Sequence, residues 1–244
     1  MQFTYSAYQE LCELLKENEY KTVCYNNWNQ YKKVVILRHD IDMDIEKAVK
    51  LSEIEKKLSV TSTYFVMLTS DFYNPCTKSN VEALNQILNN GHHIGLHFDE
   101  EAYPKAKGNP EKVSDCILRE KIILERILDN KISSFSYHRP SQKILEENLC
   151  LPDLVNSYSD VFFHNFKYVS DSRRSWREPI KEIIQSQYYS KIHILTHAFW
   201  YNTSEIDIHE TVEKFVNAGN LSRYFNLRDN ITDIDSIILR SEVR

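Results

Sequence analysis

The stretch KVVILRHDID, residues 33–42, is the most informative part of the chain. Its centre, residues 34–37, is an unbroken apolar run of the kind that forms a buried parallel strand. In an extended chain, residues two apart face the same side, so Asp40 and Asp42 share one face while Ile41 lies on the other. The sequence therefore predicts a buried strand that ends in two carboxylates on one rim.

The same succession of a short strand and a helix recurs along the chain. Strands spaced about thirty residues apart and alternating with helices indicate βαβ units and a parallel sheet. We also expect an extra helix in about the first twenty residues. Strands are expected at residues 33–38, 62–67, 93–98, 134–138, 161–163, 167–170 and 192–196, and helices at 44–58, 79–90, 111–130 and from 204 or 207 to 218.

Glycine content helps to choose between the two architectures that fit this pattern. The chain has only 4 glycines, at positions 91, 95, 108 and 219, which cannot build a GxGxxG turn or a GxxxxGK[ST] loop. A Rossmann-like open sheet therefore lacks its signature. We predict an α/β fold, a distorted TIM-like (β/α) barrel of about seven parallel strands, as a single domain over residues 1–244.

Charge and cysteine content exclude some classes of binding partner and indicate the cellular compartment. The net charge is −5, and no basic cluster is longer than Arg173-Arg174, so nucleic acid is not an expected partner. No apolar run could span a bilayer, and the oligomeric state is not predicted. Five scattered cysteines without a CxxC pair, and an N-terminal stretch unlike a signal peptide, predict a cytoplasmic protein.

The paired acids after the first strand suggest a cation. Two carboxylates on one rim repel each other and raise one pKa unless a positive charge lies between them. A metal bound by Asp42, with Asp40 left free as a base, resolves that repulsion. The alternative is that both are solvated loop acids, with Asp44 capping the next helix.

The segment GHHIGLHFDEE, residues 91–101, offers further ligands. His97 ends a strand and acids follow it, which suits a borderline metal such as zinc. Glu101 lies four residues after His97, which is the spacing that brings two side chains together on one face of a helical turn. Gly91 would end the preceding helix, and Gly95 would let neighbouring backbone approach closely. The alternative is a strand-end histidine followed by an ordinary acidic cap.

Two later segments complete the set of polar strand ends. In SYHRP, residues 136–140, Pro140 imposes extended geometry on Arg139, whose guanidinium could hold a carboxylate ionised. In LTHAFW, residues 195–200, His197 follows an apolar strand, where a titratable ring needs a partner. Each feature alone also fits a surface ion pair or a satisfied core histidine. Together, complementary groups at successive strand ends indicate one active site at the barrel mouth.

These motifs resemble those of the polysaccharide deacetylases, carbohydrate esterase family four with the NodB-homology domain. The resemblance runs from about residue 34 to residue 200 and uses RHDID, GHHIGLH, Arg139-Pro140, Asp171 with Trp176, and Leu195-Thr196-His197. The R-H-D-x-D form of the first motif is similar to a divergent branch of that superfamily. The resemblance implies that Asp40 is the catalytic base, Arg139 its orienting group and His197 the general acid, helped by Asp171.

The resemblance also implies a divalent transition metal, with zinc the first expectation. Asp42 and His97 take the places of metal ligands. The family has a second histidine four residues after the first, where this chain has Glu101. A glutamate can bind zinc, so Glu101 is the expected third ligand, and Asp99 and His138 are the alternatives.

The implied activity is metal-dependent hydrolysis of an N-acetyl group on a sugar or glycan precursor. We expect His138, Trp176 and Trp200 to contact the substrate, and Tyr103 and Tyr137 are further aromatic candidates. One alternative is hydrolysis of a cyclic amide or imide at the same site. Another is a non-catalytic glycan-binding barrel that has lost its metal.

Overall fold

A computed structural model describes residues 1–243 of the chain. Its contacts divide the chain into two compact units, Met1–Thr203 and Ser204–Arg244. Every strand, and every helix from α1 to α7, belongs to the first unit. The expected single domain over residues 1–244 stays a prediction.

The first unit is built on one parallel sheet. Seven strands follow the path β6-β5-β4-β3-β2-β8-β7, and β1 pairs with the first half of β2. No pairing joins β6 to β7 within residues 1–243, so the sheet forms a curled half-barrel. The expected α/β, TIM-like fold is confirmed. The strands are β1 (Lys21–Val23), β2 (Val34–Ile41), β3 (Thr63–Val66), β4 (His93–Phe98), β5 (Ser134–Tyr137), β6 (Val155–Asn156), β7 (Lys167–Ser170) and β8 (Lys191–Thr196).

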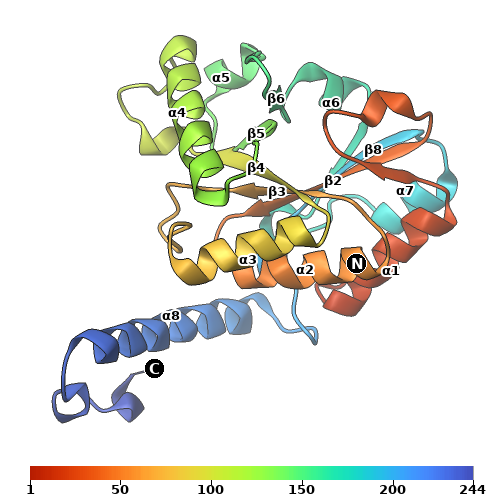
Figure 1. Ribbon diagram of the computed structural model, residues 1–244. Coiled ribbons are helices and arrows are strands. Elements are labelled where there is room, and N and C mark those ends of the chain that lie inside the picture. The colour runs from red at the N-terminus through yellow and green to blue at the C-terminus, as the bar shows by residue number, and fades with distance from the viewer. Residues whose placement is uncertain (244) are drawn as a thin grey trace. The chain divides into compact units, whose positions relative to one another are not determined.

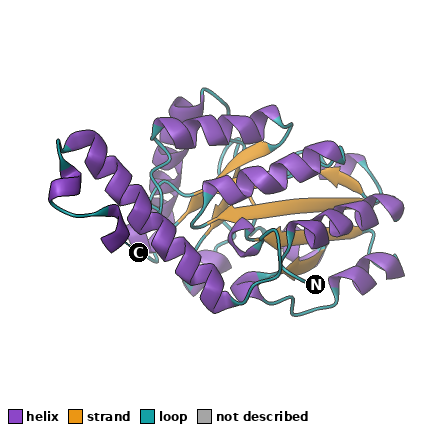
Figure 2. Ribbon diagram, turned by 90° about the horizontal axis from the view of Figure 1, so that it is seen from below, coloured by secondary structure: helices purple, strands orange, loops and turns teal. Residues whose placement is uncertain are grey.

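Helices connect the strands and cover the sheet (Figures 1 and 2). The helix predicted before the first strand is present as α1, and Asp44 caps α2 by accepting from the Lys47 N–H at 3.1 Å. The helices of this unit are α1 (Tyr5–Glu17), α2 (Ile45–Lys57), α3 (Lys78–Asn89), α4 (Pro110–Leu128), α5 (Gln142–Glu146), α6 (Asp160–His164) and α7 (Ile180–Ser186).

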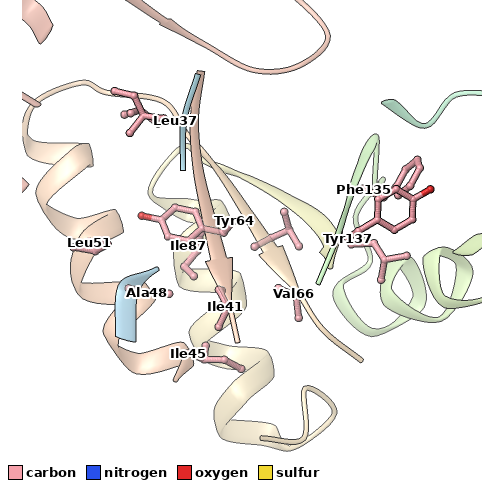
Figure 3. Close-up of a cluster of buried hydrophobic side chains, with 14 of the residues drawn as sticks. Leu37, Ile41, Ile45, Ala48, Leu51, Tyr64, Val66, Ile87, Phe135 and Tyr137 are labelled. Carbon is pink, nitrogen blue, oxygen red and sulfur yellow. The ribbon is translucent and has the colours of Figure 1, made fainter. Parts of the chain in front are cut away.

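Strand β2 separates two hydrophobic clusters. All of its residues are buried, and alternate residues point to opposite faces. Leu37 and Ile41 pack with Ala48 of α2 in the larger cluster, which Figure 3 shows between the sheet and its helices. Val34 and Ile36 belong to a smaller cluster on the other face, together with Tyr25, Phe65, Phe162 and Phe166. Arg38 and Asp40, further along β2, therefore lie on the face that carries the smaller cluster.

Gly95 on β4 is required by side-chain packing. A Cβ built at this position would lie 2.4 Å from Phe65 Cε1 and 3.0 Å from Ser134 Oγ. The close approach predicted for Gly95 exists, but it is made by side chains of the neighbouring strands rather than by backbone. Gly91 ends α3 with φ +93°, in the left-handed region that favours glycine.

Two expected elements were wrong. Residues 161–163, expected as a strand, lie in α6, and Phe162 packs on Phe166, which follows that helix, with ring centroids 5.6 Å apart. The burial of Phe162 in the smaller cluster outweighs the β-propensity of the segment. The helix expected to end at residue 218 continues through Gly219, since α8 runs from Ile208 to Asn230.

The second unit contains α8 (Ile208–Asn230) and two short 3-10 turns. Tyr224 and Ile234 are its buried apolar residues. Several large apolar side chains of this unit are exposed: Ile208, Val212, Val216, Phe225, Leu227, Ile231, Ile237, Ile238 and Leu239. Among residues 1–243, no helix combines the length and the apolarity that crossing a membrane would demand.

Candidate metal centre and active site

Polar residues that follow different strands meet at one end of the half-barrel. Asp42 follows β2, His97 lies near the end of β4, and His138 comes directly after β5. Asp171 and His197, which follow β7 and β8, are hydrogen-bonded to each other. Because the strands are parallel, their carboxyl ends share one edge of the sheet, as the sequence predicts.

Asp42, His97 and His138 form a compact group of possible metal ligands. Their ligand atoms all lie within 4.8 Å of one another. Asp42 Oδ1 is 3.1 Å from His97 Nε2 and 3.2 Å from His138 Nδ1, and the two rings meet edge to face. Within residues 1–243 no other set of three such side chains has this spacing.

The surroundings orient both histidines. Ser136 Oγ lies 2.6 Å from His97 Nδ1, which directs Nε2 of that ring toward Asp42. A hydrogen bond to the second ring nitrogen is the usual way in which proteins fix a metal-binding histidine. The backbone N–H of His138 donates to the Phe98 carbonyl at 2.9 Å, which ties this residue to the end of β4.

Glu100 holds the loop that carries His138. Its carboxylate is fully buried and accepts from the Ser141 N–H at 2.5 Å and the Gly108 N–H at 2.6 Å. The Ser141 hydroxyl is a third donor, at 3.0 Å. Glu100 therefore connects the loop after β4 to the loop after β5, a role that nothing in the sequence pattern indicates.

The electrostatics of the trio favour a cation beside Asp42. Burial by itself would raise the pKa of Asp42, but hydrogen bonds from His138 and His97 hold it well below its usual range. Burial would lower the pKa of His138, and the hydrogen bond to Asp42 raises it overall. One carboxylate oxygen and two imidazole nitrogens are the ligands of a borderline divalent metal, and three protein ligands leave a position open for chemistry. The donor set therefore fits a catalytic metal.

Glu101, the expected third ligand, lies elsewhere. Its side chain is exposed and forms an ion pair with Lys107. His97 is still part of β4, and Glu101 lies on the 3-10 turn Glu100–Ala102, so the helical i, i+4 geometry does not apply. Of the alternatives, Asp99 accepts from the Glu101 N–H at 3.1 Å and pairs with Arg139. His138 takes the third place in the trio.

Asp40 lies beside the trio and has its own partner. Arg38 Nε donates to Asp40 Oδ1 at 2.8 Å, and Nη2 donates to Oδ2 at 2.7 Å. Burial would raise the pKa of Asp40, and the Arg38 guanidinium with its hydrogen bonds brings it below its usual range. His97 Nε2 is 3.6 Å from Asp40 Oδ2. Asp40 is thus an ionised carboxylate next to the metal ligands.

Arg139 does not have the role expected of it. Its side chain is 58% exposed and donates to Asp99 Oδ2 at 2.5 Å. The guanidinium that holds Asp40 comes from Arg38, which is fully buried. The period-two pattern of RHDID could have revealed this, because Arg38 and Asp40 share a face of the strand just as Asp40 and Asp42 do.

His197 and Asp171 form the expected pair. His197 Nδ1 lies 2.6 Å from Asp171 Oδ1, and the His197 backbone N–H also donates to that carboxylate. Tyr201 adds a further donor to Asp171 Oδ2 at 3.2 Å. Burial would lower the pKa of His197, but Asp171 raises it to about 9. His197 is therefore protonated at neutral pH, and its Nε2 is 3.9 Å from Asp42 Oδ2.

The aromatic candidates differ in their exposure. Trp176 and Trp200 are half-buried, and their indole N–H groups find no hydrogen-bond acceptor within residues 1–243. Tyr137 is only 1% exposed, so it cannot present a face to a sugar. Tyr103 stacks on Phe98 and donates to Glu120 at 2.5 Å. Substrate contact by Trp176 and Trp200 stays a prediction.

Comparison with known proteins gives structural likenesses at low identity. No family model and no curated protein matches the chain. A CE4 esterase from Streptococcus mutans is 14% identical, with a TM-score of 0.49, over 93% of this chain and 89% of that one. The catalytic domain of a peptidoglycan N-acetylglucosamine deacetylase from Eubacterium rectale is 14% identical, with a TM-score of 0.47, over 82% of this chain and 87% of that one.

A CE4 family pseudoenzyme from Bacillus anthracis is 16% identical, with a TM-score of 0.46, over 77% of this chain. The match covers 62% of that protein, less than two thirds of its length. At these identities the activity has to be inferred from the side chains themselves.

Proposed function

We propose that this chain is a metal-dependent hydrolase that removes an N-acetyl group from a sugar or glycan precursor. The observation that carries the proposal is that one negatively charged and one positively charged side chain lie close to the possible metal ligands. An ionised carboxylate, Asp40, and a protonated imidazole, His197, both lie within 4 Å of the possible metal ligands. A base and an acid beside a metal trio are what hydrolysis of an amide requires.

The proposed metal is zinc, held by Asp42, His97 and His138. When bound, it would supply Lewis-acid polarisation of the amide carbonyl. The side chains do the rest. Asp40, which Arg38 keeps ionised, takes a proton from the attacking water. His197, which Asp171 keeps protonated, gives a proton to the departing amine.

The test begins with the purified protein and its metal content by elemental mass spectrometry. Acetate release from N-acetylated sugars is then measured for the wild type, Asp40→Asn, His197→Ala and the control Glu101→Gln. Loss of a general base or acid is expected to reduce the rate about 10²–10⁴-fold, whereas the exposed Glu101 should be dispensable. Acetate release that is equal in Asp40→Asn and in the wild type would overturn the proposal.

The same assay separates the alternatives. Turnover of cyclic amides or imides without acetate release would assign the site to a different C–N bond. Glycan binding with no metal and no turnover would assign it to a non-catalytic barrel, and the presence of His138 in the trio favours the enzyme. Five free cysteines support the further proposal of a cytoplasmic location, which fractionation of the native host would test.

A further inference from the structure

A small cavity lies along the end of β7 and the loop that follows it. Its volume is about 240 Å³, and it is lined by Tyr168, Val169, Ser170, Ser172, Arg177 and Glu178. Sites for drug-sized ligands occupy roughly 300–1,000 Å³, so this cavity suits a single sugar unit. Strand β7 is an end strand of the sheet and pairs only with β8 among residues 1–243.

The cavity lining contains several hydroxyl groups and one unpaired positive charge. Ser170 Oγ and Ser172 Oγ lie 2.6 Å apart, and the Ser172 N–H donates to Ser170 Oγ at 3.0 Å. Glu178 is neutralised by Lys167, whose Nζ lies 2.5 Å from Oε2. Arg177 is exposed and has no acid or acceptor within residues 1–243. The unpaired charge in the cavity lining is therefore positive, and the Arg177 guanidinium carries it.

The segment around the cavity is net positive, whereas the chain as a whole is net negative. Residues 167–178 contain four basic and two acidic side chains, whereas the whole chain has a net charge of −5. One of the two acids, Glu178, is paired with Lys167, and the other, Asp171, with His197. Of the basic side chains in this segment, Arg177 lines the cavity, so an anion that enters it meets the Arg177 guanidinium.

The cavity is next to the acid–base pair of the candidate active site. Ser170 and Ser172, which line it, flank Asp171, whose carboxylate binds the His197 ring. Arg173 and Arg174 in the same loop have φ of +60° and +56°, a left-handed conformation that is costly for residues other than glycine. The fold thus holds a basic loop beside Asp171 at some cost in backbone energy.

We propose that this cavity binds the anionic group of an acidic sugar, a carboxylate or a phosphate, with Arg177 as its partner. Arginine recognises both groups through paired N–H donors, and the serine hydroxyls are placed to bond the sugar. The inference rests on the proposed function for one point, that this acidic sugar neighbours the acetamide-bearing one in the substrate. It assigns Arg177 as a specificity-determining residue.

Binding is tested directly, without turnover. Glucuronic acid, glucose 1-phosphate and glucose are titrated by NMR into the metal-loaded wild type, Arg177→Gln and the matched control Arg126→Gln, an exposed arginine on α4. At least one acidic sugar should bind at least tenfold more tightly than glucose, and Arg177→Gln should remove that preference while Arg126→Gln keeps it. The tighter of the two acids identifies the anionic group. Equal affinity for glucose and both acids, or a preference that survives in Arg177→Gln, would overturn the proposal.

Turnover separates this inference from the proposed function. In acetate-release assays on matched acidic and neutral N-acetylated disaccharides, Arg177→Gln should raise KM for the acidic substrate about tenfold. Acidic sugars that bind through Arg177 without any acetate release would refute the deacetylase and leave the subsite standing. Acetate release with no dependence on Arg177 in binding or in KM would refute the subsite alone.

Discussion

Arg38 and Asp40, two residues apart on β2, form a buried bidentate ion pair, with N···O distances of 2.8 and 2.7 Å. The Arg38 guanidinium also lies over the rings of Phe65 and Tyr158, at 5.4 and 4.8 Å from their centroids. The base proposed for the reaction is thus held by its own strand, and the charge that keeps it ionised is shielded from water.

The first prediction concerns this pair. Arg38→Met leaves the buried Asp40 carboxylate without its cation, which should cost about 3–5 kcal/mol in the free energy of unfolding. Arg139→Met removes an exposed arginine and should cost no more than about 1 kcal/mol. Urea unfolding of both variants makes the comparison. Equal stability of the two would contradict the assignment of Arg38 as the partner of Asp40.

The second prediction concerns the metal ligands. His138→Ala removes one of three donors and should weaken zinc binding by more than the roughly 10–100-fold that is typical when a supporting residue is lost. Glu101→Gln should bind zinc as the wild type does, because Glu101 pairs with Lys107 outside the trio. Calorimetric zinc titration measures both affinities. The reverse order of effects would restore Glu101 as a ligand.

The third prediction concerns Asp171. Asp171→Asn removes the charge that keeps His197 protonated and so should lower kcat for acetate release about 10²-fold or more. Zinc affinity should hardly change, since Asp171 is outside the metal trio. Steady-state kinetics with a parallel metal titration separates the two effects. A variant that loses metal and activity together would speak against the acid–base role.

The fourth prediction concerns pH and stability. Glu55 on α2 is fully buried and accepts from Tyr8 and Tyr64 at 2.6 Å and from Ser62 at 2.7 Å. Burial alone would raise its pKa, but His39 and these hydrogen bonds lower it to about 2. A folded-state pKa below the ordinary 4.5 stabilises the fold above pH 4.5, and this contribution, roughly 3 kcal/mol, is lost as the pH falls toward 2.

Glu55→Gln should therefore be much less stable than the wild type at pH 7 and differ less from it at pH 3. Chemical unfolding at both pH values tests this. A stability difference that is the same at pH 7 and pH 3 would show that the Glu55 charge has no net effect.

The fifth prediction concerns two glycines. Gly95→Ala places a methyl group against the buried Phe65 ring and should destabilise the first unit by about 1–3 kcal/mol. Gly219→Ala lies within α8, where the nearest heavy atom is 3.9 Å away, and should be neutral or stabilising by up to about 1 kcal/mol. Thermal unfolding monitored by circular dichroism measures both changes. A drop in Tm for Gly219→Ala alone would contradict the packing described for β4.

The sequence by itself determined the strand alternation and the strand ends that carry chemistry. Three local features could be predicted from the local sequence pattern alone. They are the apolar run before Asp40, the helix cap at Asp44 and the end of α3 at Gly91. The pairing of Asp171 with His197 came from the resemblance to known motifs, and the structure places them in contact.

Only the tertiary structure decided the third member of the metal trio, whereas the period-two pattern of residues 38–42 already places Arg38 on the same strand face as Asp40. The resemblance to known motifs favoured Arg139 and the i, i+4 spacing favoured Glu101, yet Arg38 holds Asp40 and His138 joins the metal trio. The reason is that spacing gives the direction of a side chain within one element, whereas ligand distances depend on how far strand ends lie from each other. Curling of the parallel sheet brings the residue after β5 to within 3.2 Å of Asp42, and the 3-10 turn after β4 directs Glu101 to Lys107.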